Sequence, residues 1–199
     1  MVGKSVSRRS RARASEAVAS EASEDRAAAA ADRAEAERLR EEAAAMLALA
    51  TTDELTGAWS RRFGLEEIER MLIRAKREGD QLVLAFIDVD KLKQVNDVHG
   101  HQAGDELLAL IGHVVRAHLR PYDIVVRYGG DEFVCAMPNM SSAQARGRFE
   151  EIAAVLTQLD PAHSISFGIA EAQADENLPR LIISADTDLL HARESRRTA

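Results

Sequence analysis

Apolar positions from residue 53 onward recur with two spacings, and each spacing predicts one kind of element. A spacing of three and four residues predicts helices at residues 61–76, 104–119, 142–159 and 178–194. Continuous apolar runs predict buried strands at residues 81–90 and 163–170. Two short strands flank Gly129 and Gly130, which we expect to form a two-residue hairpin turn with positive φ. Because helices and strands interleave, the sequence predicts an α/β sandwich with a mixed sheet.

The N-terminal quarter of the chain has a different pattern. Residues 1–14 carry Lys and Arg without an acid, which favours a disordered, solvated tail over an arm that contacts nucleic acid. Residues 15–52 are rich in Ala, Glu and Arg and predict a long helix. A weak apolar stripe in it leaves two interpretations open, a coiled-coil dimerisation segment and a single connecting helix. The stripe consists of Ala36, Leu39, Ala43, Met46 and Ala50. We expect one compact domain over residues 53–199.

Composition and charge narrow the class of protein. The net charge of -7 argues against a general nucleic-acid binder. The single cysteine, Cys135, fits a reducing compartment, and its place in a strand predicts a core residue rather than a nucleophile. No apolar run approaches the roughly 18–20 residues that span a bilayer, and no signal-peptide core is present. We therefore expect a cytoplasmic protein without a membrane span.

Acidic residues gather where two predicted strands end. Asp88 and Asp90 are two residues apart on one strand, so both side chains point to the same face. If the hairpin pairs beside this strand, Asp131 and Glu132 arrive next to Asp88. Like charges repel unless a cation lies among them, and carboxylate oxygens suit Mg²⁺. The sequence thus predicts metal-assisted phosphoryl chemistry, with solvated hairpin acids and helix capping by Asp90 as the alternatives.

The segment after this strand carries groups that suit a nucleotide. Its backbone amides, together with Lys91 and Lys93, can bind phosphate oxygens. An amide and a carboxylate, here Asn96 and Asp105, can together recognise a guanine edge. Taken alone, Asn96 and Asp105 are better explained as ordinary turn and N-cap residues.

Several segments, in this order, resemble the GGDEF-domain diguanylate cyclases, a bacterial family that makes cyclic di-GMP from two GTP. They are "DELTGAWSRR", "FIDVDKLKQVNDVHGHQAGDELL", "RYGGDEF", "SISFGIA" and "ADTDLLHARESRR", and they extend from Asp53 to about Thr198. The resemblance implies a mainly antiparallel central sheet surrounded by helices, similar to nucleotidyl-cyclase and polymerase palm folds. It also implies Mg²⁺, or Mn²⁺ in its place, as the cofactor and a homodimer as the active form.

The resemblance further implies roles for residues of the acidic cluster. The metal ligands would be Asp88, the backbone carbonyl of Val89, Asp131 and Glu132. Glu132 would also assist the attacking 3′-hydroxyl. Gly129 and Gly130 would let the backbone approach the nucleotide closely.

Residues outside the acidic cluster would bind the substrate GTP and the product cyclic di-GMP. Asn96 and Asp105 would bind guanine, and the triphosphate would be contacted by Lys93, Arg193 and Arg197. The segment "RPYD" places Arg120 and Asp123 where the family often has an R-x-x-D site for inhibition by its own product.

Some positions depart from the family pattern. Ser60 replaces an Asn, Leu92 and His99 replace aromatic residues, and Asp188, Leu190 and Arg193 take the places of Ala, Tyr and Lys. Arg in place of Lys keeps the charge but changes the geometry. Because none of these changes touches the acidic cluster, we expect a working enzyme. The alternative is a non-catalytic GGDEF module that binds GTP or cyclic di-GMP and signals through its N-terminal helix.

Overall fold

The computed structural model describes residues 33–43 and 51–198, with side chains up to Ser195. The chain divides into two compact units, residues 1–48 and 49–199. In the first unit, residues 33–43 are helical and Leu39 is 55% exposed. The predicted basic tail and most of the predicted N-terminal helix, with Met46 and Ala50, lie outside the described residues, so the coiled coil stays a prediction.

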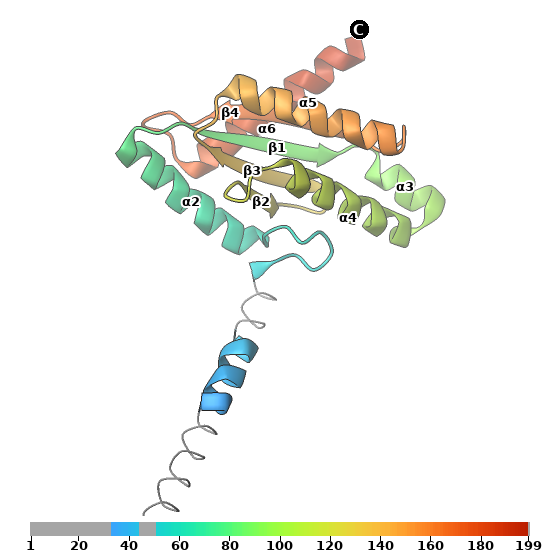
Figure 1. The fold of residues 1–199 in the computed structure, drawn as a ribbon. Coiled ribbons are helices and arrows are strands. Elements are labelled where there is room, and N and C mark those ends of the chain that lie inside the picture. The colour runs from blue at the N-terminus through green and yellow to red at the C-terminus, as the bar shows by residue number, and fades with distance from the viewer. Residues whose placement is uncertain (1–32, 44–50, 199) are drawn as a thin grey trace, which may run out of the picture. The chain divides into compact units, whose positions relative to one another are not determined.

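The second unit contains the predicted alternation of helices and strands. In chain order its elements are α2 (Arg61–Glu78), β1 (Leu82–Val89), α3 (Leu92–His99), α4 (His101–His118), β2 (Ile124–Arg127), β3 (Glu132–Pro138), α5 (Ser142–Leu159), β4 (Ile165–Glu171) and α6 (Leu178–Thr198) (Figure 1). The α/β class and, from residue 61 onward, each predicted helix and strand are confirmed.

The strands form one sheet in the order β2-β3-β1-β4. Among the described residues, β1 pairs with β3 and β4, and β2 pairs with β3, always in antiparallel fashion. One isolated bridge, between Trp59 and Val126, is parallel. A mainly antiparallel sheet is therefore confirmed, and β1 lies at its centre.

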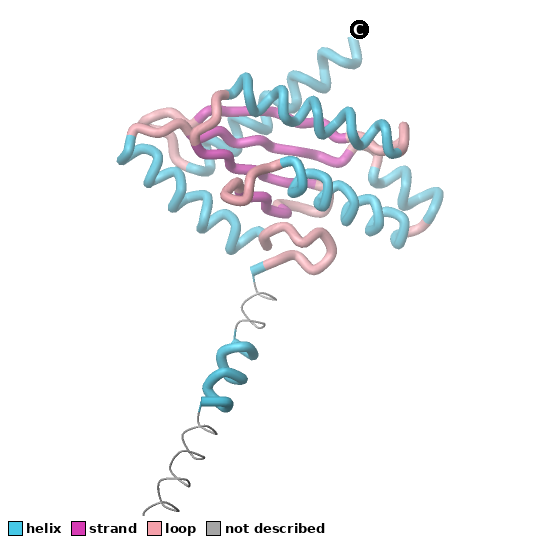
Figure 2. Tube along the Cα trace, viewed as in Figure 1, coloured by secondary structure: helices cyan, strands magenta, loops and turns pink. Residues whose placement is uncertain are grey.

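Helices cover both faces of this sheet (Figure 2). Val83, Ala85 and Ile87 of β1 pack in one cluster with residues of α4 and α5. The alternate residues, such as Leu84 and Phe86, pack in a second cluster with residues of α2 and α6. Since successive side chains of a strand point to opposite faces, covering both faces makes β1 apolar throughout. Cys135 is fully buried in the first cluster, as predicted, and burial raises the pKa of its thiol.

The connection between β2 and β3 differs from the predicted two-residue turn. It runs over residues 128–131, and neither Gly129 nor Gly130 has a positive φ. The amides of Tyr128 and Gly129 both donate to the carbonyl of Glu132, at 2.8 and 3.2 Å. The expectation of a tight turn was wrong because these two bonds close a wider loop. The backbone of this loop does not require the positive φ that glycine allows.

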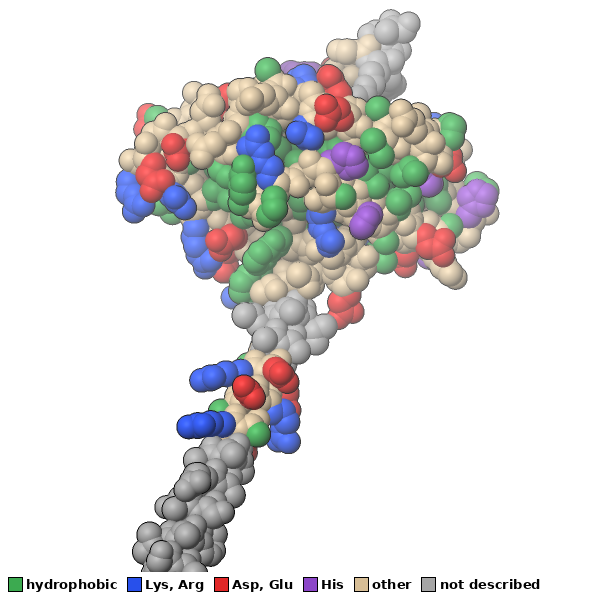
Figure 3. All heavy atoms as spheres, in the orientation of Figure 1, with side chains coloured by type: hydrophobic (Ala, Val, Ile, Leu, Met, Phe, Trp, Pro, Cys, Tyr) green, Lys and Arg blue, Asp and Glu red, His purple; other side chains and the backbone are tan. Residues whose placement is uncertain are grey.

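The surface of this unit carries charges of both signs. On the face drawn in Figure 3, basic and acidic side chains are interspersed with apolar ones. Within the described ranges, no helix is both long and apolar enough to cross a membrane.

Asp188 of α6 links this helix to α5 and to the edge of the sheet by hydrogen bonds. Its carboxylate accepts a hydrogen bond from the amide of Ile169 on β4 at 2.8 Å and one from Arg146 on α5 at 2.7 Å. β4 is an edge strand, so this amide would otherwise lack an acceptor. Burial raises the pKa of Asp188, but these two bonds and the charge of Arg146 outweigh it, and the pKa lies below its usual value.

Replacing Asp188 by Ala is expected to lower the free energy of unfolding by about 1–3 kcal/mol, because an edge amide and a guanidinium lose their acceptor. Urea unfolding at pH 7 measures the change. Asp175→Ala, at an exposed position before α6, is the matched control. Equal unfolding midpoints for Asp188→Ala and the wild type would contradict the role of Asp188.

This contribution of Asp188 should depend on pH. The folded-state pKa is lowered, so the stabilisation is complete above the unfolded-state pKa of about 3.9 and is lost as the pH falls through the folded-state value. The stability difference between the wild type and Asp188→Ala should therefore shrink when the urea titration is repeated below about pH 4.

Candidate functional site

The acidic residues predicted to converge do lie together. Asp88, near the end of β1, is directly opposite Glu132, the first residue of β3. The amide of Val89 donates to the carbonyl of Asp131 at 2.9 Å. The sheet register thus brings the end of β1 against the tip of the β2–β3 loop.

This cluster carries more negative charge than its surroundings neutralise. Burial raises the pKa of Asp88, Arg193 lowers it, and the charges of Asp131 and Asp90 raise it, with a net upward shift. Burial also raises the pKa of Glu132, and the charges of Asp131, Asp88 and Asp186 add to this effect, while Arg61 opposes it. The site therefore favours an additional cation.

Arg193 of α6 supplies the cation in this structure. Its guanidinium donates to Asp88 and, at 3.2 Å, to Asp90, which confirms that both acids face the same side. Asp90 also accepts from the Ser166 hydroxyl at 2.7 Å. The helix-capping alternative for Asp90 is not seen, because α3 begins after Lys91 without a side-chain cap. Asp90 is thus a partner of Arg193, a role that the sequence did not indicate.

The donor chemistry at the cluster fits a divalent cation. Asp88, Asp131 and Glu132 offer carboxylate oxygens, and Val89 offers a carbonyl, all of them ligands that Mg²⁺ accepts. As the side chains lie now, no three His, Cys, Asp or Glu residues in the described part of the chain are arranged to hold a metal ion. Asp88 is engaged by Arg193 instead. A cation at Asp88 would therefore compete with Arg193 for this carboxylate.

The structure also brings the two predicted guanine ligands into one region. Asn96 lies on α3, and its Oδ1 is buried without a hydrogen-bond partner. A Cβ added to Gly104 on α4 would lie 2.0 Å from that atom, so Gly104 leaves the space that Asn96 occupies. Asp105 follows directly and is exposed. The α3–α4 region thus contains an unpaired amide oxygen and an exposed carboxylate, and both groups are suited to a ligand that donates hydrogen bonds.

The structure does not place the two other predicted phosphate ligands, Lys93 and Arg197, at the acidic cluster. Lys93 is exposed in the first turn of α3, and no described contact joins it to the acidic cluster. The side chain of Arg197 lies outside the described residues. Their assignments stay predictions.

Arg120 and Asp123 border a separate pocket of about 230 Å³. Asp123 Oδ2 accepts from the amide of Arg120 at 2.8 Å, whereas Oδ1 is buried without a hydrogen-bond partner. Burial raises the pKa of Asp123, and this effect outweighs the amide bond and the charges of Arg120 and Arg148. Arg116, which sequence reasoning missed, also lines the pocket. The pocket thus offers arginines and an unpaired carboxylate oxygen to a ligand.

The family profile described as "Diguanylate cyclase, GGDEF domain" matches residues 50–199. The chain belongs to the GGDEF family.

Two known bacterial proteins are similar to this chain in sequence. The chain is 32% identical over 171 residues to the response regulator PleD of Caulobacter vibrioides, a match that covers 81% of this chain and 38% of PleD. It is 34% identical over 156 residues to the diguanylate cyclase DgcP of Pseudomonas aeruginosa, covering 74% of this chain and 23% of DgcP. The chain therefore spans well under half the length of either relative.

Solved structures share the fold. The coiled coil and GGDEF domain of DgcB from Caulobacter crescentus, in complex with c-di-GMP, is similar with a TM-score of 0.78 and 29% identity, covering 85% of this chain and 94% of that chain. The diguanylate cyclase SiaD of Pseudomonas aeruginosa, in complex with its activator SiaC, is similar with a TM-score of 0.71 and 30% identity, covering 94% of this chain and 76% of that chain.

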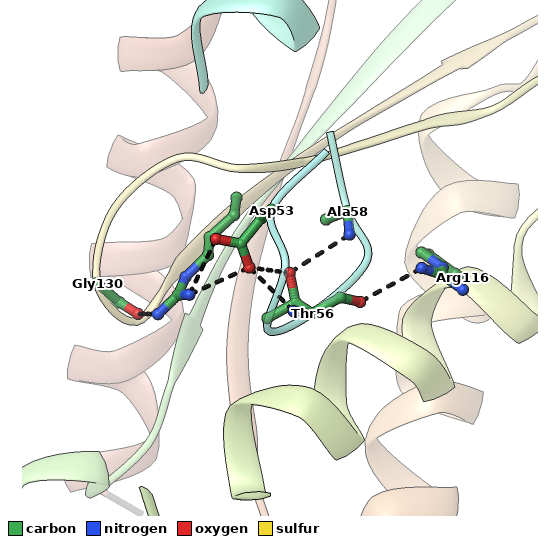
Figure 4. Close-up of polar contacts among 6 residues, drawn as sticks. Asp53, Thr56, Ala58, Arg116 and Gly130 are labelled. Carbon is green, nitrogen blue, oxygen red and sulfur yellow. Dashed lines mark hydrogen bonds and ion pairs between the residues drawn. The ribbon is translucent and has the colours of Figure 1, made fainter. Parts of the chain in front are cut away.

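A second ion pair of the GGDEF domain was also missed from the sequence. Arg127 donates to both oxygens of Asp53 at 3.1 Å and to the carbonyl of Gly130 at 2.9 Å (Figure 4). Asp53 also accepts hydrogen bonds from the amide and hydroxyl of Thr56 in a turn. Asp53 and Arg127 lie in two of the segments that resemble the family, but nothing in either segment indicates that they pair.

The electrostatics agree with a stable Asp53–Arg127 pair. Burial raises the pKa of Asp53, but the Thr56 hydrogen bonds and Arg127 outweigh it, so the pKa is lowered. The two side chains are only 25% and 19% exposed. This pair therefore anchors the β2–β3 loop of the GGDEF domain.

Asp53→Asn keeps the shape of Asp53 but removes its charge. We expect the free energy of unfolding to fall by about 1–3 kcal/mol, since Arg127 loses a charged acceptor. Amide exchange at Tyr128 and Gly129 should become faster. Chemical unfolding and hydrogen-exchange NMR measure the two effects, with Asp80→Asn at an exposed position as the control. Unchanged exchange in the loop would show that Asp53 does not anchor it.

Proposed function

We propose that this chain is a diguanylate cyclase. It joins two GTP molecules into cyclic di-GMP by attack of each 3′-oxygen on the α-phosphorus of the other, and each new bond expels one pyrophosphate. The observation that carries the proposal is the convergence of Asp88, Asp131 and Glu132 beside Arg193. Since GTP is a cytoplasmic nucleotide, we place the activity in the cytoplasm.

Asp88, the Val89 carbonyl, Asp131 and Glu132 would hold Mg²⁺, or Mn²⁺ in its place. The bound ion would supply positive charge against the triphosphate and the developing charge at the reacting oxygens. The support is that burial, together with the charges of the neighbouring acids, raises the pKa values of Asp88 and Glu132, so that a cation there would be stabilising.

The side chains around the cluster have distinct tasks in this reaction. Arg193 would transfer from Asp88 and Asp90 to phosphate oxygens once a metal ion is bound by the acidic cluster. Lys93 and Arg197 would add positive charge near the phosphates. Glu132 accepts a hydrogen bond from the 3′-hydroxyl, or its proton, as the upward shift of its pKa favours. Gly130 leaves open space for the nucleotide, because a Cβ there would meet no atom within 4 Å.

Guanine recognition falls to the α3–α4 region. Asn96 and Asp105 provide an acceptor and a carboxylate, and guanine donates from N1–H and its exocyclic amine. The unpaired Oδ1 of Asn96 supports this assignment. A site that leaves such groups unpaired with adenine should prefer GTP over ATP.

The reaction needs two domains, because one domain binds one GTP and the bonds join two nucleotides. We therefore propose a homodimer in which two sites face each other. A helical segment N-terminal to the domain would raise the local concentration of the partner domain. The solved DgcB structure, which combines a coiled coil with a GGDEF domain, supports this arrangement.

Conversion of GTP tests the proposal. Purified protein with GTP and Mg²⁺ should form cyclic di-GMP, separated by chromatography. Asp131→Asn should lower the rate at least about a thousandfold, because one carboxylate at the reacting phosphate is lost. Its free energy of unfolding should not fall, since a repelling charge is removed. Asp175→Asn, an exposed acid outside the site, is the control.

The outcome also separates the enzyme from the alternative. Wild-type turnover by Asp131→Asn would contradict the role of the acidic cluster. A wild-type protein that binds GTP or cyclic di-GMP but forms no product would be the non-catalytic GGDEF module instead.

We also propose that the pocket at Arg120 and Asp123 binds cyclic di-GMP and inhibits the enzyme. Arg120→Ala should raise the product concentration for half-inhibition at least about tenfold, since a hydrogen bond to a charged group is lost. Initial rates over a range of added cyclic di-GMP measure this. Arg62→Ala, whose side chain is 91% exposed, is the control. Unchanged inhibition in Arg120→Ala would exclude this pocket.

A further inference from the structure

A turn at residues 53–58 touches the Arg120–Asp123 pocket on one side. The carbonyl of Thr56 accepts a hydrogen bond from Arg116 of α4 at 3.3 Å (Figure 4). Arg116 and Gly57 both line the pocket. A Cβ on Gly57 would lie 2.0 Å from Arg116 Nη1, so the glycine leaves room for the guanidinium against the turn. The turn is thus held in part by a pocket residue.

The other side of the turn is fastened to the β2–β3 loop. The Thr56 hydroxyl donates to Asp53 at 2.7 Å, and Asp53 accepts two bonds from Arg127. Arg127 in turn donates to the carbonyl of Gly130, which precedes Asp131. A series of side-chain and backbone contacts therefore leads from Arg116 of the pocket to the carbonyl of Gly130, the residue before Asp131 (Figure 4).

The bond between Arg116 and Thr56 is the weakest step of this series. At 3.3 Å its donor–acceptor distance is long, and its acceptor is a neutral carbonyl. Arg116 is exposed, so its guanidinium is accessible to a ligand in the pocket. A phosphodiester oxygen carries a negative charge and accepts a stronger bond from a guanidinium than a carbonyl does. A phosphate-bearing ligand in the pocket would therefore draw Arg116 away from Thr56.

We propose that Arg116 is a further ligand-binding arginine of this pocket, and that its transfer from Thr56 to a phosphodiester loosens the turn and, through Asp53 and Arg127, the loop that carries Asp131. The proposal rests on the proposed function, because it takes the ligand to be the cyclic dinucleotide product. It adds to that function a route of inhibition within one domain.

Linkage makes this coupling reciprocal. If the pocket ligand lowers the affinity of the Asp131 site for nucleotide and metal, then bound nucleotide and metal must lower the affinity of the pocket for its ligand by the same factor. Arg116 is where the two states differ, since it has one acceptor in each. Removing the Arg116 guanidinium should therefore have two effects. It should lower the affinity of the pocket for its ligand, and it should abolish the coupling between the pocket and the loop that carries Asp131.

The experiment compares the full-length wild type with Arg116→Gln and, as a control, Arg62→Gln at a 91% exposed side chain. Calorimetry with cyclic di-GMP alone gives the affinity. Hydrogen-exchange NMR with and without saturating cyclic di-GMP follows the amides of Tyr128 and Gly129, which line no part of the pocket. Conversion of GTP is measured separately on the same wild-type preparation.

We expect Arg116→Gln to bind cyclic di-GMP at least about fivefold more weakly than the wild type and the control. Saturating ligand should speed exchange at Tyr128 and Gly129 in the wild type and leave it unchanged in Arg116→Gln. Equal affinities would show that Arg116 is not a ligand-binding residue. A ligand response of the loop that persists in Arg116→Gln would overturn the coupling.

A wild type that does not bind cyclic di-GMP would also overturn this proposal. The separate GTP conversion would then show whether the cyclase assignment itself still holds.

Discussion

Repulsion among carboxylates at the ends of two paired strands is the constraint around which this domain is organised. Asp88 and Glu132 are opposite each other in the β1–β3 ladder, and Asp131 adds a third charge at the same place. Like charges opposite each other destabilise a sheet. The fold tolerates them because β1 and β3 are otherwise buried between two apolar clusters, so their pairing does not depend on the charged end. Burial of the sheet thus makes a destabilising site possible.

The register of that pairing determines whether the site exists. A slip of β3 by one residue would move each of its side chains to the other face. It would then move Phe133 from the first apolar cluster into the second, and Val134 from the second into the first. The same apolar residues that stabilise the sheet therefore fix Asp88 against Glu132, with no need for a bond between the acids. Asp53 and Arg127 add a separate anchor on the loop side.

Periodicity predicted the elements of this domain well because its helices and strands bury apolar residues at regular spacing. The acidic convergence was predictable for a related reason, since strand ends and hairpin tips are defined by local sequence. The β2–β3 turn was not, because two adjacent glycines permit a positive φ without requiring it.

Contacts between distant segments were beyond sequence reasoning. Arg193 meets Asp88 across 105 positions, and Arg127 meets Asp53 across 74. Packing of α6 and of the turn creates these pairs. In the same way, Asp188 departs from the family pattern, but only the structure shows that its partners are Arg146 and the Ile169 amide.

Arg193 connects the stability of the domain to the chemistry we propose. Without substrate, its guanidinium neutralises part of the charge on Asp88 and Asp90. The domain can therefore keep these acids close together without a bound metal. A triphosphate offers the same guanidinium a stronger anionic partner, and a cation at Asp88 then replaces the charge that Arg193 withdraws. Each exchange alone removes one charge partner, because nucleotide alone takes Arg193 from Asp88, and metal alone leaves Arg193 with Asp90 only. Binding of nucleotide and of metal is therefore expected to be cooperative, as a consequence of one arginine having two competing anions.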